Sequence, residues 1–213
     1  AIRSGVEVLR RCGTDSVRGE HALRSIERQV RHEARLLEDL LNVARIARGK
    51  VLMRFEHVEL TRLICATLDD YRDALEENGL TLEVAAPETP LWVTGDPTRL
   101  AQVFANLLHN AIKFTDSGGV VRVTLEVSPD SHWVCVTVED TGVGMDPLVL
   151  SRLFEMFSQG ERTRERSRGG LGLGLALVKG LVEIHGGEVA AASPGPGLGA
   201  RFTVTLPLQS APE

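Results

Sequence analysis

Residues 134–145 constrain the fold of this chain most, because they predict a half-buried strand that ends in a glycine turn. Valines at every second position alternate with more polar side chains, as in a strand with one buried face. The strand then leads to Asp140, in a turn that contains Gly142 and Gly144. An ionised carboxylate beside an apolar strand needs a partner, and Asp140 can accept a hydrogen bond from an amino group such as that of adenine. The two glycines let backbone approach a flat ligand closely. The alternative interpretation is an Asp that caps an ordinary turn.

Composition excludes several classes of protein. The 213 residues are 43% hydrophobic and 25% charged, which is ordinary for one or two globular domains. A net charge of −5 provides no overall attraction to nucleic acid or to a membrane surface. Cys12, Cys65 and Cys135 are far apart and odd in number, which favours reduced thiols over a disulfide framework or a cysteine metal site. The first residue is not Met and falls in a helical pattern, so we expect a fragment of a longer chain.

The first 48 residues predict a helical hairpin with a short first helix, to about residue 11, and a long second helix. Heptad spacing relates Leu23, Val30, Leu37 and Ala44, and also Ile26, Glu33, Leu40 and Ala47. Such a repeat is typical of a coiled-coil or bundle seam. Because the short helix cannot cover the long one, the hairpin either lacks its beginning or pairs with another chain.

The rest of the chain predicts alternating strands and helices. We expect helices at 62–77, 96–114, 148–157 and 175–185, and strands at 80–84, 91–93, 120–127, 132–139, 188–192 and 200–206. Thr61 is the expected N-cap of the first of these helices. Residues 158–168 contain four arginines and no apolar side chain, and they predict a mobile loop.

The helix over residues 96–114 carries two stripes. One is apolar, with the spacing of a core-facing helix. The other holds Gln102, Asn106, Asn110 and Lys113, about one turn apart each. A carboxamide oxygen suits Mg²⁺, which keeps waters and substrate phosphates in its shell, and Lys113 can supply positive charge to a phosphate. The alternative is a solvated helix face.

A glycine-rich run precedes the last predicted helix. Gly170, Gly172 and Gly174 alternate with leucines and lead directly into that helix. Backbone N–H groups at a helix N-terminus form an anion site. The spacing is not that of the dinucleotide fingerprint, so a Rossmann fold is disfavoured.

Four motifs occur together and in a fixed order. They are NLLHNAIKFT at 106–115, DTGVGM at 140–145, LFEMF at 153–157 and GGLGLGLALVKGLVEIHGG at 169–187. The set resembles the N, first glycine, F and second glycine boxes of bacterial sensor histidine kinases. It resembles, more loosely, the wider ATPase superfamily of gyrase, mismatch-repair and heat-shock chaperone proteins. Residues 38–51, EDLLNVARIARGKV, resemble the run from the second dimerisation helix into the kinase domain.

The resemblance implies an α+β fold. Residues 1–48 would form a partial dimerisation hairpin, 49–57 a linker, 58–208 the ATP-binding catalytic domain and 209–213 a tail. That domain would be an α/β sandwich, a mixed sheet with three helices on one face. ATP would lie between the helices and a lid.

The resemblance also implies roles for individual residues. Asn110 would ligate Mg²⁺, Lys113 would touch the phosphates, and Asp140 would accept from the adenine amine. The implied nucleotide-binding residues are Asn106, Asn110, Lys113, Asp140, Gly142, Gly144, Met145, Gly170, Leu171, Gly172, Leu173 and Gly174.

The function implied is the catalytic core of a two-component sensor histidine kinase, a protein-histidine kinase with ATP and Mg²⁺ as cofactors. Its partners would be a second copy, through the helical hairpin, and a response regulator receiver domain, but not nucleic acid. The location would be cytoplasmic, including the cytoplasmic part of a membrane-bound sensor.

The acceptor histidine of the family would lie upstream of Ala1, so we expect no catalytic residue within the chain and no autophosphorylation by it alone. His32 lies in the second-helix pattern and is not expected to be the acceptor. His21, His57, His109, His132 and His185 are interpreted as structural or solvent-exposed.

Two other functions are considered. The first is a clamp-type superfamily ATPase, which would need a glutamate base early in the asparagine helix, where Gln102 and Asn106 stand. The second is a dimerising pseudokinase without catalysis. The complete asparagine, aspartate and glycine motifs argue against it.

Overall fold

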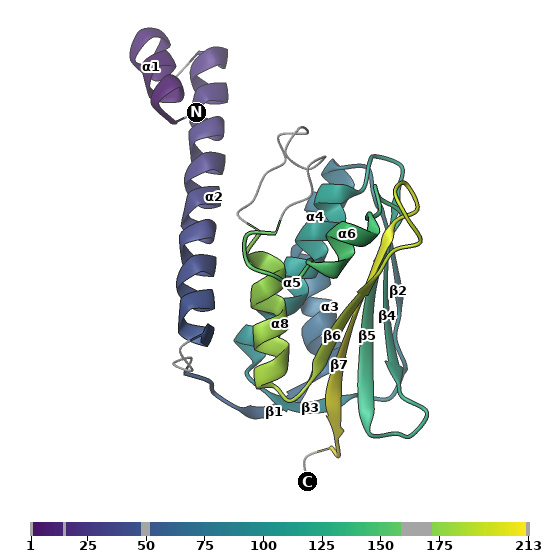
Figure 1. Ribbon diagram of the computed structural model, residues 1–213. Helices are drawn as coiled ribbons and strands as arrows, with labels where there is room; N and C mark the ends of the chain where they lie inside the picture. The colour runs from purple at the N-terminus through teal and green to yellow at the C-terminus, as the bar shows by residue number, and fades with distance from the viewer. Residues whose placement is uncertain (1, 15, 48–51, 159–171, 212–213) are drawn as a thin grey trace.

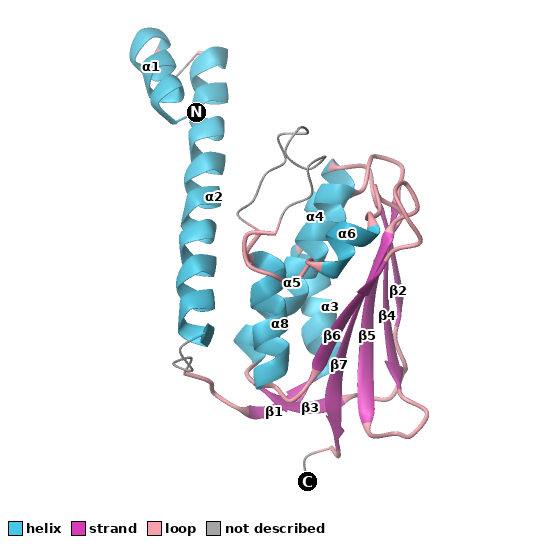
Figure 2. Cartoon of the chain, viewed as in Figure 1, coloured by secondary structure: helices cyan, strands magenta, loops and turns pink. Residues whose placement is uncertain are grey.

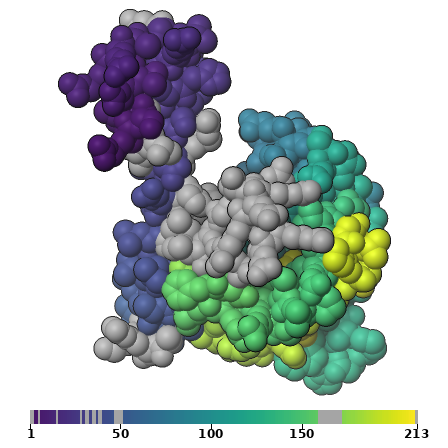
Figure 3. All heavy atoms as spheres, turned by 45° about the horizontal axis from the view of Figure 1, so that its top comes forward, coloured from purple at the N-terminus to yellow at the C-terminus, as the bar shows by residue number. Residues whose placement is uncertain are grey.

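The computed structural model describes residues 2–14, 16–47, 52–158 and 172–211. Two helices, α1 (Ile2–Cys12) and α2 (Val17–Ala47), precede a domain in which helices cover one face of a sheet (Figures 1 and 2). The N-terminal end of α2 projects beyond the domain together with α1 (Figure 3). The expected α+β architecture, with a mixed sheet and three helices on one face, is confirmed.

The described part of the sheet has seven strands in the order β1-β3-β7-β5-β4-β2, and β6 pairs with β7. The strands are β1 (Glu56–Glu59), β2 (Thr81–Ala85), β3 (Trp92–Gly95), β4 (Val120–Val127), β5 (Trp133–Asp140), β6 (Glu188–Ala192) and β7 (Ala200–Gln209). β2 runs parallel to β4, and the other pairs are antiparallel.

Strand β5 lies between β4 and β7 and has the predicted alternation. Val134, Val136 and Val138 are buried under the helices, whereas Cys135 and Thr137 are half-buried on the other face. Side chains of a strand alternate between faces, so the last residue of β5 points into the helix side of the sheet. The sequence pattern thereby brings an aspartate to the edge of the apolar core.

Helices α3 (Leu60–Asp70), α5 (Pro97–Phe114) and α8 (Gly174–Ile184) cover the sheet, beside the short helices α4 (Arg72–Glu77) and α6 (Pro147–Ser151). The apolar stripe of α5 is buried, as predicted: Leu100, Val103, Phe104, Leu107, Leu108 and Ala111. Burial of each large apolar side chain contributes about 1.5–3 kcal/mol. This stripe therefore fixes which face of α5 remains for a ligand.

The N-terminus of α5 is held by a buried polar cluster. The Asp96 carboxylate caps the helix by accepting from the N–H of Arg99, at 3.1 Å. The N–H of Asp96 donates to Nε2 of His185 at 3.0 Å. Nδ1 of His185 therefore carries the proton and donates to the carbonyl of Leu181, at 2.7 Å. Burial lowers the pKa of His185, which fits the structural role expected for this histidine.

The predicted helix over 62–77 differs from the structure. It begins at Leu60 and is divided at Tyr71 into α3 and α4. Thr61 is therefore inside α3 and is not its cap. The reason is tertiary, because the N–H of Leu60 donates to the carbonyl of Leu91 (2.7 Å), so that β1 continues directly into the helix.

Two other element boundaries differ between the sequence prediction and the structure. The helix expected over 148–157 ends at Ser151, and turns follow it up to Phe157, which has a φ of 64° and whose N–H donates to the carbonyl of Gly172. The expected tail from residue 209 is wrong at Gln209, which pairs with Trp92 of β3. The loop expected over 158–168 lies outside the described residues, except Ser158.

Helix α2 includes the residues with heptad spacing, and its C-terminal end meets the domain. Val43 is buried there, and Gly180 of α8 packs so closely on Ile46 that an added Cβ would lie 2.8 Å from its Cγ2. Cys12, Cys65 and Cys135 are free thiols. None of the described helices combines the length and apolar character that crossing a membrane requires.

Candidate functional site

The centre of the candidate site is the carboxylate of Asp140, the last residue of β5. The residue is only 6% exposed, and its Oδ1 accepts from the N–H of Gly142 at 2.9 Å. Burial raises the pKa of Asp140, and backbone N–H groups of Gly142 and Ala200 partly oppose that shift. A carboxylate has about four acceptor positions, so Asp140 can bind a further donor.

The turn after Asp140 is attached to the C-terminal end of α5. The N–H of Val143 donates to the carbonyl of Phe114 at 3.0 Å. A Cβ at Gly142 would lie 2.3 Å from that same carbonyl oxygen. Only glycine allows this approach, so the sequence motif brings the aspartate beside the last turn of α5.

A second loop, residues 193–199 between β6 and β7, holds the turn from the other side. The N–H groups of Gly197 and Gly199 donate to the carbonyls of Val143 and Gly142, at 2.6 and 3.1 Å. Gly144 has a φ of +62°, and a Cβ there would lie 2.1 Å from the carbonyl oxygen of Gly195. The two loops therefore pack backbone against backbone.

Sequence reasoning did not include this second loop in the site. A signal was present, because residues 195, 197 and 199 are alternating glycines. All three have positive φ values. However, alternating glycines predict a turn and not its partner, and the pairing of Asp140 with Ala200 in the sheet decides what the turn contacts.

The polar stripe of α5 is half-buried, beside the apolar stripe. Asn106, Asn110 and Lys113 follow one another at helical spacing. Nζ of Lys113 lies 4.8 Å from the ring centroid of Phe114. Gln102 accepts from the guanidinium of Arg99 at 2.9 Å, so its amide oxygen already has a partner within α5.

The N-terminus of α8 faces this stripe. A Cβ at Gly174 would lie 3.4 Å from Oδ1 of Asn106. Leu173, the N-cap residue, is buried and makes no side-chain cap, while Gly172 has a φ of +69°. The structure thus brings Asn106 together with Gly174. Gly170 and Leu171 of the predicted set lie outside the described residues.

The described residues contain no group of three or more histidine, cysteine or acidic side chains that could cage a metal ion. The amide oxygens of Asn106 and Asn110 are the available donors on α5. Mg²⁺ commonly takes one or two protein oxygens and completes its shell with water and substrate phosphates. This donor set fits an ion that is shared with a bound phosphate.

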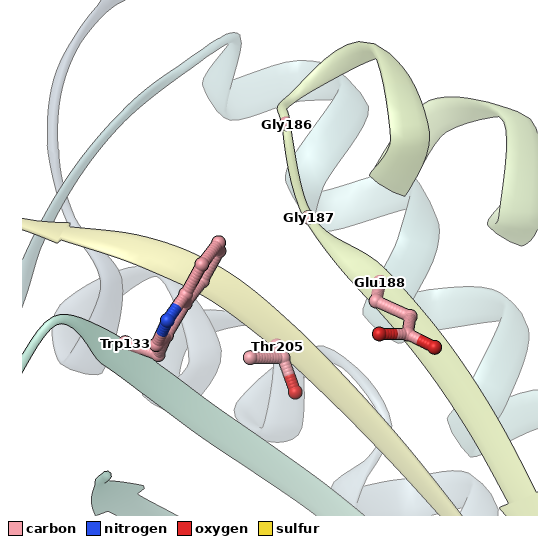
Figure 4. A pocket seen from close by; sticks show the side chains of 5 residues that line it. All are labelled: Trp133, Gly186, Gly187, Glu188 and Thr205. Atoms are coloured by element: carbon pink, nitrogen blue, oxygen red, sulfur yellow. The ribbon is translucent and has the colours of Figure 1, made fainter. Parts of the chain in front are cut away.

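A separate pocket lies at the other end of β5 (Figure 4). It is lined by Trp133, Gly186, Gly187, Glu188 and Thr205. Trp133 begins β5 and Asp140 ends it, so the two lie roughly 20 Å apart at about 3.3 Å per residue. This pocket is thus distant from Asp140, and we assign it no function.

Comparison with known proteins identifies relatives of the chain. The family model described as "Histidine kinase-, DNA gyrase B-, and HSP90-like ATPase" matches residues 95–210, which are more than half of the chain. The probable sensor histidine kinase TcrY of Mycobacterium tuberculosis is 36% identical over 208 residues, 98% of this chain and 42% of TcrY. Two further curated relatives are matched over 12% and 21% of their lengths. The chain thus spans less than half of each.

Solved structures agree with this result. The mycobacterial sensor histidine kinase MprB is 30% identical with a TM-score of 0.63, and the match covers 74% of this chain and 100% of the solved MprB chain. Full-length ShkA, solved in complex with AMPPNP, is 27% identical with a TM-score of 0.77, covering 98% of this chain and 43% of ShkA.

Proposed function

The chain belongs to the histidine kinase-, DNA gyrase B- and HSP90-like ATPase family, and we propose that it is the ATP-binding catalytic core of a two-component sensor histidine kinase. In this proposal it binds Mg-ATP and transfers the γ-phosphoryl group to a histidine. The phosphoryl group then passes to the receiver domain of a response regulator. The relatives named as sensor histidine kinases support this choice within the family.

The observation that carries the proposal is the buried carboxylate of Asp140. It is held by backbone N–H groups at the end of a core strand and can accept from one more donor. The exocyclic amine of adenine is such a donor, whereas a purine carbonyl at the same position would oppose it as acceptor against acceptor. Gly142, Gly144 and Met145 would line the base.

The phosphates would lie along α5 and at the N-terminus of α8. Lys113 would contribute positive charge, and Asn106 would lie near the phosphates because it adjoins Gly174. The free N–H groups at a helix N-terminus favour an anion, which is the role proposed for residues 170–174. Asn110 would bind Mg²⁺ through its amide oxygen.

The chain's residues would act mainly by position and charge. Mg-ATP supplies the phosphoryl group, and phosphoryl transfer depends largely on alignment and charge stabilisation. Asp140 would orient the nucleotide from its base, while Lys113 and the asparagines would hold its phosphates. The reacting phosphorus would thereby be directed away from the base and towards the incoming histidine.

The proposed partners are a second copy of the chain and a response regulator. Leu23, Val30 and Leu37, seven residues apart on α2, are 40%, 51% and 59% exposed. An exposed heptad seam is suited to pairing with other helices, and a dimer would cover it. Because both ATP and response regulators occur in the cytoplasm, we place the chain there.

Calorimetry of the chain with ATP, with and without Mg²⁺, tests the binding step. We expect Mg²⁺-dependent binding. The transfer step is tested with γ-labelled ATP and the histidine-bearing helical domain of a sensor kinase, added in trans. Acid-labile label on that domain is expected. A folded chain that does not bind Mg-ATP contradicts the proposal, and steady phosphate release without label transfer indicates an ATPase instead.

A further inference from the structure

We propose that Ser193, in the loop between β6 and β7, is a positioning residue that determines selectivity for the adenine base. It would act through the Asp140 turn and would not touch the nucleotide itself. This inference rests on the proposed function, because it assumes that Asp140 binds the base.

The Ser193 hydroxyl connects the two loops by accepting and donating hydrogen bonds. Its Oγ accepts from the N–H of Met145 at 2.9 Å. It lies 2.7 Å from the carbonyl oxygen of Gly199 and 3.3 Å from that of Gly195. A hydroxyl has one proton, so the shorter contact, to Gly199, is the donated bond.

The two residues that the Ser193 hydroxyl connects, Gly199 and Met145, both adjoin the Asp140 turn. Gly199 has a φ of +75°, and a Cβ there would lie 2.0 Å from the carbonyl oxygen of Asp140. Met145 ends the turn that begins at Asp140, and its side chain packs against the core. The hydroxyl thus ties Gly199, which precedes the sheet partner of Asp140, Ala200, to the far end of the turn.

Loss of the Ser193 hydroxyl should weaken binding of the base more than binding of the phosphates. The direction of a hydrogen bond matters, since its strength falls steeply with misalignment. If the turn relaxes, the Asp140 carboxylate loses its alignment with the base amine. The proposed phosphate ligands lie on α5 and at the start of α8, and none of the bonds that Ser193 makes to described residues involves those helices.

The test compares three variants of the chain with the parent. Ser193→Ala removes the hydroxyl, and Ser193→Thr keeps it. Ser128→Ala is the matched control, because the Ser128 hydroxyl also accepts a backbone N–H, that of Trp133 at 3.1 Å, but in the β4–β5 turn at the other end of the sheet. Dissociation constants are measured for Mg-ATP, for Mg-ITP, which carries a carbonyl in place of the adenine amine, and for magnesium tripolyphosphate.

We expect Ser193→Ala to bind Mg-ATP about tenfold more weakly, the effect of one lost hydrogen bond, and to bind Mg-ITP and tripolyphosphate as the parent does. The ATP-to-ITP preference should therefore fall about tenfold, return with Ser193→Thr, and stay unchanged in Ser128→Ala. Retained tripolyphosphate binding shows that the variant is folded.

Three outcomes overturn the inference. They are an unchanged ATP-to-ITP preference in Ser193→Ala, an equal loss of all three ligands, and failure of Ser193→Thr to restore the preference. If the parent itself does not prefer ATP to ITP, or does not bind Mg-ATP, the proposed function fails first. The parent measurement thus separates the two failures.

Discussion

Replacement of Asp140 by asparagine is the sharpest test of the site. The two side chains have nearly the same shape, so Asp140→Asn changes charge and hydrogen-bonding character with little change in packing. The remaining oxygen can still accept from the N–H of Gly142, which lies 2.9 Å from Oδ1. The new NH₂ group would be directed at the adenine amine, and two donors would then oppose each other.

The expected magnitude follows from the burial of Asp140, which is 6% exposed. A hydrogen bond to a charged group in such a place contributes about 1.5–3 kcal/mol. At about 1.4 kcal/mol per tenfold, Mg-ATP affinity should fall roughly tenfold to just over a hundredfold. Mg-ITP should bind no more weakly than before, because its carbonyl can accept from the new NH₂ group.

Isothermal calorimetry with both nucleotides measures this preference. Asp130→Asn is the matched control, because Asp130 is an exposed aspartate in the β4–β5 turn and should leave both constants unchanged. Circular dichroism and magnesium tripolyphosphate binding establish that Asp140→Asn is folded. An unchanged ATP affinity in the folded variant would refute the assignment, as would an equal loss for ATP and ITP.

Three further predictions concern other parts of the molecule. Asn110→Ala should remove the Mg²⁺ dependence of ATP affinity while adenosine binding persists in calorimetry, and equal loss of both would assign Asn110 to the fold. Since burial lowers the pKa of His185, its contribution to stability is present above about pH 6.5 and is lost as the pH falls towards the lowered pKa. In urea unfolding, the stability of His185→Gln should fall less than that of the parent as the pH is lowered. The stability of His132→Gln, which is changed at an exposed site, should fall as much as that of the parent. Gly144→Ala should destabilise by about 2–4 kcal/mol, because its Cβ would meet a carbonyl oxygen at 2.1 Å. Gly118→Ala, with positive φ but open space, should cost only about 1–2 kcal/mol, and equal losses would contradict the close packing.

The sequence alone was sufficient where one element's own periodicity decides the outcome. The apolar stripe of α5 and the alternation of β5 are local patterns, and both are buried as predicted. The residue types of the candidate site could also be predicted from the sequence. A carboxylate that ends a core strand has few chemical uses, and so do amides in line on a helix. The mixed sheet with three helices on one face followed from the family resemblance.

Tertiary structure decided the boundaries and the supports of the site. Helix α3 begins at Leu60 because Leu91 accepts its N–H, and β7 extends to Gln209 because β3 lies beside it. Likewise, the sequence around Ser193 indicates only an ordinary turn. The hydroxyl of Ser193 reaches Met145, 48 positions earlier, only because β7 pairs with both β5 and β6 in the sheet. The physical reason is common to all three cases. A backbone or hydroxyl group must find a hydrogen-bond partner when it is buried, and which partner it finds depends on strand order and register, which no local pattern of residues encodes.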